Sequence, residues 1–206
     1  MLDYHDWATR LKTLRCKWFA KPDLGRWADT SKWEDWEERT RIIAGMLSPN
    51  SRVIEFGAGK RQLERHLPVG SQYFPSDIVD RGHDTIILDL NARPLPDLRT
   101  RRFDIAVFAG VLEYVVDLPT FVPWLARQVP VCIASYNCAK SAAGALARLP
   151  ETYHRVGAGW TNCFNQTELV ALFGREGFAL EGTTDQHAPG GSERVFLFRQ
   201  SRKPIA

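Results

Sequence analysis

A short apolar strand that runs directly into a glycine-rich turn constrains this chain more than any other feature. Residues 53–56 carry one acidic side chain, Glu55, among apolar ones, and Gly57-Ala58-Gly59 follow at once. We predict a helix over residues 60–67 after this turn. Glycines between a strand and a helix let the backbone approach a ligand closely, and a helix N-terminus offers unpaired N–H groups. The pattern indicates a site for a nucleotide-type cofactor.

Strand-like and helix-like segments alternate from residue 51 onward, which is typical of an α/β domain with a largely parallel sheet. The predicted strands are 52–56, 72–76, 85–88, 103–108, 130–135, 178–184 and 193–199. The predicted helices in this part are 60–67, 118–127 and 167–173. A turn-rich segment around His187, which we expect to be solvated, joins the last two strands into a hairpin.

The first 47 residues differ in composition, since they hold five of the seven tryptophans. We divide the chain into an N-terminal helical, Trp-rich extension (1–47), a candidate lid over an acceptor, and a cofactor-binding domain (48–206). A helix is predicted over 5–19, and Ser31 to Glu34 form a capping box that predicts a second helix ending before Pro49. Trp33 and Trp36 share one face of that helix and are expected in the core. For Trp7, Trp18 and Trp27, the sequence allows either a position in the core or a position in the lid.

The bulk composition describes an ordinary globular protein of 206 residues with a net charge of +3. This small charge gives no reason to invoke nucleic acid. The four cysteines are scattered, without metal-ligand spacing, and we expect buried or free thiols and no metal. The N-terminus lacks the pattern of a signal peptide, and no apolar run reaches transmembrane length. We therefore expect a cytoplasmic protein without a membrane partner.

Further polar or small residues follow the later strands, where they would face the same edge of the sheet. Asp77 ends the second strand about 20 residues after the glycines, the usual place for a carboxylate that binds a ribose diol. Its alternative interpretation is a turn or capping aspartate. Asp89, followed by Leu90, ends the third strand and could accept from an adenine amine or cap a loop. Ala109 and Gly110 end the fourth strand and would leave room for a ligand.

The ordered set Glu55-Phe56-Gly57-Ala58-Gly59, Asp77, Asp89-Leu90-Asn91 and Ala109-Gly110-Val111-Leu112-Glu113-Tyr114 resembles the class I S-adenosylmethionine-dependent methyltransferases. The resemblance covers roughly residues 50–200. It implies a three-layer Rossmann-like fold with a seven-stranded, mostly parallel sheet of order 3-2-1-4-5-7-6, strand 7 antiparallel. It also implies S-adenosylmethionine as the cofactor and S-adenosylhomocysteine as its product.

The same resemblance implies a role for each matching residue. Glu55, Gly57 and Gly59, with Phe56 and Ala58 between them, would line the methionine part of the cofactor. Asp77 and Ile78 would hold the ribose, and Asp89 with Leu90 the adenine. Ala109 and Gly110 would lie beneath the sulfonium. Gln62 stands where the dinucleotide fingerprint has its last glycine, so a pyrophosphate is disfavoured.

Two positions depart from the family pattern. Lys60 replaces a common third glycine, and Tyr114 replaces a frequent histidine that would have been the obvious base. Methyl transfer from a sulfonium depends mainly on positioning, and a base is needed only for a poor nucleophile such as a hydroxyl. We name His154 and Tyr114 as candidate catalytic residues, with Tyr136 as an alternative, and we expect no chemical role for Glu113.

The first functional hypothesis is a methyltransferase that acts on a small molecule, at a hydroxyl oxygen of a metabolite, sugar or natural product. A methyltransferase acting on RNA or protein is the second. Basic residues between 10 and 26 favour it, and the modest net charge disfavours it. A non-catalytic binding module that keeps the fold is the third, because no base is obvious and Lys60 departs from the pattern.

Overall fold

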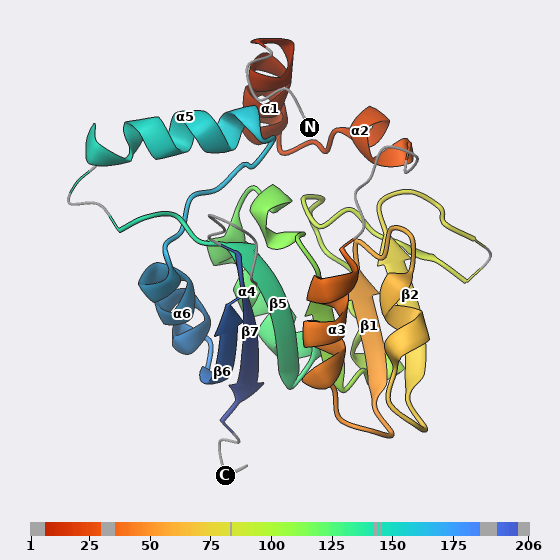
Figure 1. Cartoon of the computed structure of the whole chain (residues 1–206). Helices are drawn as coiled ribbons and strands as arrows, with labels where there is room; N and C mark the ends of the chain where they lie inside the picture. The colour runs from red at the N-terminus through yellow and green to blue at the C-terminus, as the bar shows by residue number, and fades with distance from the viewer. Residues whose placement is uncertain are drawn as a thin grey trace.

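The computed structural model describes residues 7–29, 36–82, 84–141, 144, 146–185 and 193–201. Its centre is a seven-stranded sheet of order β3-β2-β1-β4-β5-β7-β6 (Figure 1). The strands are β1 Arg52–Phe56, β2 Gln72–Asp77, β3 Ile86–Ile87, β4 Ile105–Phe108, β5 Val131–Asn137, β6 Phe178–Asp185 and β7 Glu193–Gln200. Strands β1 to β5 run parallel, and β7 is antiparallel to both β5 and β6. The predicted order and the terminal hairpin are confirmed.

Helices cover both faces of the sheet and one of its ends. The α-helices are α1 Trp7–Phe19, α2 Leu24–Ala28, α3 Glu37–Gly45, α4 Leu118–Gln128, α5 Leu149–Gly157 and α6 Gln166–Arg175. The 3-10 helices are η1 Gln62–His66, η2 Arg99–Arg101, η3 Leu112–Tyr114 and η4 Leu146–Arg148. Helices α3 and η1 lie on one face, α4 and α6 on the other, and α1, α2 and α5 lie beyond the carboxyl ends of the parallel strands (Figure 1).

Alternate side chains of the central strands enter two separate cores. Ile54 of β1 and Phe108 of β4 belong to the larger core, which α4 and α6 cover. Val53 and Val107, their neighbours in the same strands, belong to the smaller core under α3 and η1. A strand that is buried on both faces is mostly apolar, which explains why β4 is apolar throughout and why Glu55 is the one acidic residue in β1.

Local signals fix the helices on the larger core. Asn165 accepts a hydrogen bond from the Glu168 N–H at 2.9 Å, and the Glu168 carboxylate accepts one from the Asn165 N–H at 3.0 Å, so α6 begins with a full capping box. Asp117 caps α4 by accepting from the Thr120 N–H at 3.1 Å. These caps satisfy N–H groups that the first turn of a helix leaves unpaired.

The structure corrects two of the predicted helices. The helix predicted over 60–67 is only the five-residue 3-10 helix η1, because Arg61 takes a left-handed conformation (φ 56°) that stops an α-helix from starting there. The capping box at Ser31 does not begin α3, since Trp36 is its N-cap and Glu37 its first residue. Ser31, Trp33 and Glu34 lie outside the described residues, as does His187.

The N-terminal segment is tied to distant parts of the chain. Arg26 donates to the Ala158 carbonyl at 2.9 Å, and Arg81 donates to the Trp27 carbonyl. Lys12 pairs with Asp23 at 2.6 Å and braces α1 against α2. Within the described residues, no helix is both long and apolar enough to cross a membrane.

Candidate functional site

Two backbone hydrogen bonds fix the glycine turn to the end of the neighbouring strand. The Ala58 N–H donates to the Ser76 carbonyl at 3.0 Å, and the Gly59 N–H donates to the Asp77 carboxylate at 2.9 Å. Gly57 and Gly59 both have positive φ angles, 69° and 50°. Glycine adopts this conformation without the steric cost that other residues incur. The sequence therefore specifies a turn that brings bare backbone to the carboxyl ends of β1 and β2.

At two of the glycines, neighbouring side chains lie so close to the backbone that no Cβ would fit, in addition to the restriction from the positive φ angle. A Cβ on Gly57 would lie 2.5 Å from Cγ2 of Val111. A Cβ on Gly110, whose φ is 70°, would lie 2.6 Å from Nη1 of Arg39. The two glycines follow β1 and β4 at the same edge of the sheet, where Val111 and Arg39 pack directly against bare backbone. We call this glycine-lined edge the cradle, because backbone without side chains allows the close approach that the extended methionine part of S-adenosylmethionine needs.

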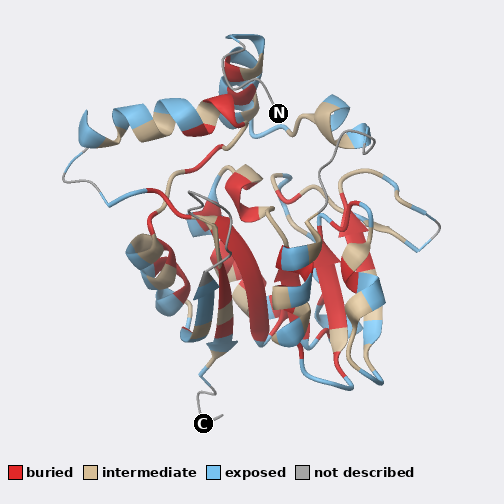
Figure 2. Ribbon diagram, in the orientation of Figure 1, coloured by how far each residue is buried: buried red, intermediate tan, exposed pale blue. Residues whose placement is uncertain are grey.

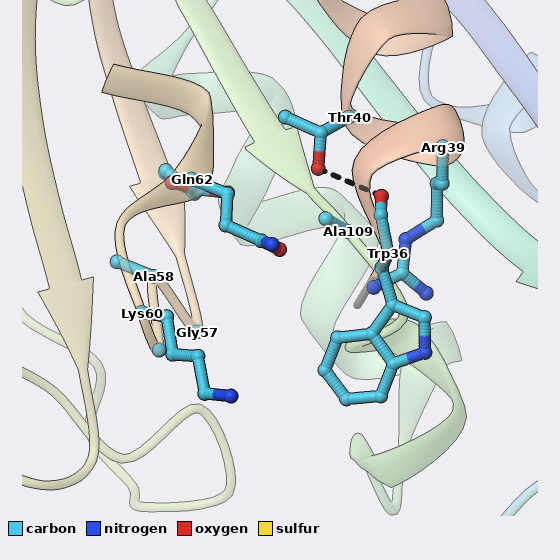
Figure 3. A pocket seen from close by; sticks show the side chains of 10 residues that line it. Trp36, Arg39, Thr40, Gly57, Ala58, Lys60, Gln62 and Ala109 are labelled. Carbon is cyan, nitrogen blue, oxygen red and sulfur yellow. Dashed lines mark hydrogen bonds between the residues drawn. The ribbon is translucent and has the colours of Figure 1, made fainter. Parts of the chain in front are cut away.

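A pocket opens at this cradle, and its walls come from three separate parts of the chain. Its lining consists of Trp36, Arg39, Thr40, Glu55, Gly57, Ala58, Gly59, Lys60, Gln62 and Ala109. In Figure 3, Lys60 and Gln62 lie on one side of it, and Trp36 and Arg39 lie on the other. Thr40 donates to the Trp36 carbonyl at 3.0 Å, a contact within the first turn of α3 at the pocket wall. Trp36 is half-buried in this wall, so the prediction that it belongs to the core is wrong.

Glu55 is the acidic group of the pocket, and it is nearly inaccessible to solvent. Burial raises its pKa to about 8, although the hydrogen bond from the Tyr73 hydroxyl and the charge of Arg39 both oppose the rise. A buried carboxyl without a full countercharge favours its neutral form. A cationic ligand beside it would favour the ionised form, and S-adenosylmethionine carries both an ammonium and a sulfonium.

The second predicted carboxylate, Asp77, is buried at the end of β2 and already accepts several hydrogen bonds. Its donors are the N–H groups of Gly59 and Val79, at 2.9 and 3.0 Å, and Nε of Arg81 at 3.3 Å. Arg81 also reaches the Trp27 carbonyl, so Asp77 is connected through one side chain to the segment after α1. The hydroxyl of the neighbouring Ser76 is buried and has no hydrogen-bond partner among the described residues.

The remaining predicted cofactor residues lie in different surroundings. Asp89 is half-buried, and its Oδ1 accepts from the Asn91 N–H at 2.8 Å, which is the loop-capping contact. The side chain of Leu90 belongs to the larger core, as does that of Phe56, which stacks on Phe108 at 4.9 Å. Only the backbone of Leu90 and Phe56 can therefore face a ligand. Ile78 is half-buried directly after Asp77.

Tyr114 lies in a cluster of aromatic and cationic side chains under the N-terminal segment. The rings of Tyr114 and Trp27 meet edge to face, with centroids 4.6 Å apart, and the Arg26 guanidinium lies 5.7 Å from the Tyr114 ring. Burial raises the pKa of the Tyr114 hydroxyl, while the charges of Arg26 and Arg39 partly oppose the rise. A phenol with a raised pKa stays protonated at neutral pH and acts as a hydrogen-bond donor.

The other two candidate bases lie away from this pocket lining. His154 occupies an exposed position on α5. Tyr136 is fully buried, and its hydroxyl donates to Oδ1 of Asn162 at 2.5 Å while it accepts from the Phe164 N–H at 3.0 Å. Its hydrogen-bonding capacity is used within the protein, so Tyr136 is a structural residue.

A buried polar network lies after strands β4 and β5, and the sequence pattern did not reveal it. Arg155 donates to the carbonyls of Asn162 and Asn137, at 2.9 and 2.8 Å, and to the Tyr136 hydroxyl at 3.0 Å. Glu113 accepts from the Asn137 N–H at 2.8 Å with one oxygen, and its other oxygen is buried without a hydrogen-bond partner in the described part of the chain. Burial raises the pKa of Glu113. The network joins the loop after β4 to the end of β5.

The described residues show neither the side-chain pattern of a metal site nor a disulfide. No group of three or more His, Cys, Asp or Glu side chains in the described ranges is placed to hold a metal ion. None of the four cysteines, all of which lie in those ranges, forms a disulfide.

A family model described as "Methyltransferase domain" matches residues 16–182, which is most of the chain. No curated protein sequence matches the chain. Several solved structures share its fold at low sequence identity. An S-adenosylmethionine-dependent methyltransferase from Mesorhizobium loti is 16% identical, with a TM-score of 0.58, and the match covers 77% of this chain and 96% of that one.

Two further structures are similar to the chain over different extents. Magnesium protoporphyrin IX methyltransferase from Synechocystis PCC 6803, solved with its cofactor bound, is 14% identical, with a TM-score of 0.57, and 92% of this chain and 97% of that chain are covered. The pyocyanin biosynthetic protein PhzM is 13% identical, with a TM-score of 0.56, and the match covers 79% of this chain and 54% of PhzM. The chain therefore spans about half the length of PhzM.

The sheet order, the glycine cradle and the family match together define a Rossmann-like transferase. The chain belongs to the class I S-adenosylmethionine-dependent methyltransferases, and S-adenosylmethionine is its cofactor.

Proposed function

We propose that the chain transfers the methyl group of S-adenosylmethionine to a hydroxyl oxygen of a small-molecule acceptor. One observation carries this proposal. The N-terminal segment supplies a wall of the same pocket that the glycine turn opens, through Trp36 and Arg39. A pocket closed by side chains from a separate segment suits a small ligand better than a polymer. In this proposal residues 1–47 act as a lid, and residues 48–206 hold the cofactor.

The proposed cofactor contacts follow the carboxyl ends of the strands. Glu55, Gly57 and Gly59, with the backbone of Phe56 and Ala58, bind the methionine part. Asp77 and Ile78 bind the ribose, while Asp89 and the backbone of Leu90 bind the adenine. Ala109 and Gly110 lie beneath the reacting centre. The cofactor supplies a methyl group on a positively charged sulfur, and these residues orient it and exclude water.

The proposed acceptor site lies between this cradle and the aromatic cluster. Tyr114 would donate a hydrogen bond to the acceptor, which suits a phenol that stays protonated. Trp27 and Trp36 would contact its apolar surface. His154 stays a proposal for the base, and its exposed position requires that α5 or the acceptor bring it to the hydroxyl. Transfer from a sulfonium releases a neutral thioether, so the acceptor proton is the only charge that must be removed.

Calorimetry with S-adenosylhomocysteine tests the cofactor site without requiring a known acceptor. We expect binding to be lost in Gly57→Arg, which fills the cradle, and weakened at least about tenfold in Asp77→Ala, which removes a charge-assisted contact to the ribose. Asp97→Ala is the matched control, because that carboxylate is exposed and pairs with Arg99 in a loop outside the pocket. Equal binding by all four proteins would reject the proposed site.

The acceptor class is tested by turnover against a panel of hydroxyl, amine and thiol compounds, with mass spectrometry to detect one added methyl group. Methylation of amines alone would refute the hydroxyl assignment. For the base, His154→Ala and Tyr114→Phe are compared with the wild type in turnover and in cofactor binding. Loss of turnover with intact binding supports a role for either residue, and full activity in His154→Ala removes it from the chemistry.

A further inference from the structure

Helix α1 displays an unbroken apolar stripe to solvent. Trp7, Leu11, Leu14 and Trp18 follow each other at steps of four, three and four residues, which places all of them within about 60° of arc on an α-helix. Their exposed fractions are 69%, 60%, 50% and 84%. Figure 2 shows exposed residues along this helix, at the outer end of the molecule. Single exposed apolar residues are common, but a contiguous apolar stripe of this kind marks an interaction surface.

The buried side of α1 is polar, which is the reverse of the usual arrangement. Arg10 and Thr13 are its buried residues. The Arg10 guanidinium lies 4.2 Å from the centre of the Tyr153 ring on α5, and Thr13 donates to the Thr9 carbonyl at 2.8 Å. A surface helix of a globular protein normally turns its apolar stripe inward. Helix α1 is anchored through polar groups, so its apolar stripe is directed away from the protein.

The charge of residues 7–22 indicates which kind of partner surface the apolar stripe binds. Residues 7–22 contain five Lys or Arg and no Asp or Glu. Two of these, Arg15 and Lys17, are exposed and lie on either side of the stripe, each roughly 70–90° from its centre. Basic residues that flank a stripe of Trp and Leu are typical of helices that lie in the interface of a membrane, where their charges meet anionic headgroups.

Other occupants fit these observations less well. A two-fold contact between copies of the chain would bring the same basic helices together, without acidic partners in residues 7–22. Nucleic acid would use the basic residues but would leave the four apolar side chains in water. A helix of 13 residues is too short to cross a bilayer. The expectation of no membrane partner was based on the lack of such a spanning segment, and a helix that lies on the membrane surface departs from that expectation.

We propose that α1 docks on the surface of an anionic lipid bilayer, with Trp7, Leu11, Leu14 and Trp18 in the boundary between headgroups and acyl chains. Tyr153, on the adjoining α5, is also exposed, and its ring faces the Arg10 guanidinium of α1. Helices α1 and α5 lie beyond the carboxyl ends of the strands, at the same end as the cofactor cradle (Figure 1). Docking in this way turns the pocket end of the protein toward the membrane.

Vesicle co-sedimentation of the full chain tests the proposal. We expect binding to phosphatidylcholine vesicles that contain about 30% phosphatidylserine, weak binding to phosphatidylcholine alone, and release as NaCl is raised. The double variant Leu11→Glu/Trp18→Glu should abolish binding. Val69→Glu is the matched control, since Val69 is 89% exposed and precedes β2 at the opposite end of the strands. A second variant, Arg15→Gln/Lys17→Gln, should weaken binding about 30-fold, because each charge contributes about 1 kcal/mol near the surface.

Folding is checked by circular dichroism and by S-adenosylhomocysteine binding, which all variants should retain. Two results would overturn the proposal: no sedimentation of the wild type with anionic vesicles, or wild-type sedimentation of both double variants. A dimer in light scattering that Trp18→Glu converts to a monomer would assign the stripe to a second copy instead. Salt-sensitive RNA binding without vesicle binding would assign the basic residues to nucleic acid.

Discussion

The buried carboxyl of Glu55 should make the stability of the protein depend on pH, and Glu55→Gln should remove that dependence. Burial raises the pKa of Glu55 from 4.5 to about 8, so between these values the folded state holds a proton that the unfolded chain has released. Stability therefore falls as pH rises through this window, by about 1.4 kcal/mol per pH unit for one group. From pH 6 to pH 8 the loss is about 2–3 kcal/mol.

Urea denaturation of the wild type and Glu55→Gln at pH 6, 7 and 8 measures this difference. Glutamine keeps an oxygen that can accept from the Tyr73 hydroxyl, and it never ionises. The variant should therefore exceed the wild type by about 2 kcal/mol at pH 6, where the unfolded wild type has already released its proton, and by about 4 kcal/mol at pH 8. Glu38→Gln, an exposed substitution on α3, is the control and should follow the wild type. The comparison isolates Glu55 from the buried Glu113, whose pKa is also raised. A constant difference between wild type and Glu55→Gln across this range would refute the reasoning.

Three further substitutions test the described contacts by urea titration at pH 7. Gly57→Ala should cost about 2–4 kcal/mol, from the positive φ and from the contact with Val111, whereas Gly45→Ala, with no atom near its Cβ, should be neutral or stabilising. A loss below about 1 kcal/mol in Gly57→Ala would contradict the close approach. Arg155→Met should cost about 3–5 kcal/mol because it leaves buried acceptors unpaired, and an unchanged transition would show that the network is dispensable. Asn165→Ala should cost about 1 kcal/mol through loss of the α6 cap, and a neutral result would assign that cap no role.

The strands could be predicted from the sequence because a run of consecutive apolar residues is enough to indicate a buried strand. Residues 105–108 are apolar throughout and lie in the middle of the sheet, and the terminal hairpin was bounded by turn residues. The glycine turn was also predictable, since its positive φ angles restrict the residue type. These features depend on which residues are neighbours in sequence.

The missed features depend on contacts between distant residues. Arg61 has a left-handed backbone conformation, and its guanidinium donates a hydrogen bond to Asp84, 23 positions away. No local sequence pattern predicts that contact. Arg155 has the residue type expected at a surface, yet it is buried among carbonyls that come from two other segments. Trp36 is spaced from Ile43 and Leu47 as residues on one helical face are, which predicted a core position. Helix α3 begins only at Glu37, however, and Trp36, as its N-cap, lies in the pocket wall.

The long-range ties of the N-terminal segment have a consequence for the order of folding. Arg26 bonds to Ala158, 132 positions later, and α1 packs beside α5, which the chain supplies only after β5. Contacts so distant in sequence cannot form until the intervening chain exists, and closing such a loop is slow. This segment is synthesised before the elements that it contacts, and it is thus among the last parts of this fold to reach its final position. During synthesis its apolar stripe and basic residues are therefore exposed before the strands and helices that follow them have folded.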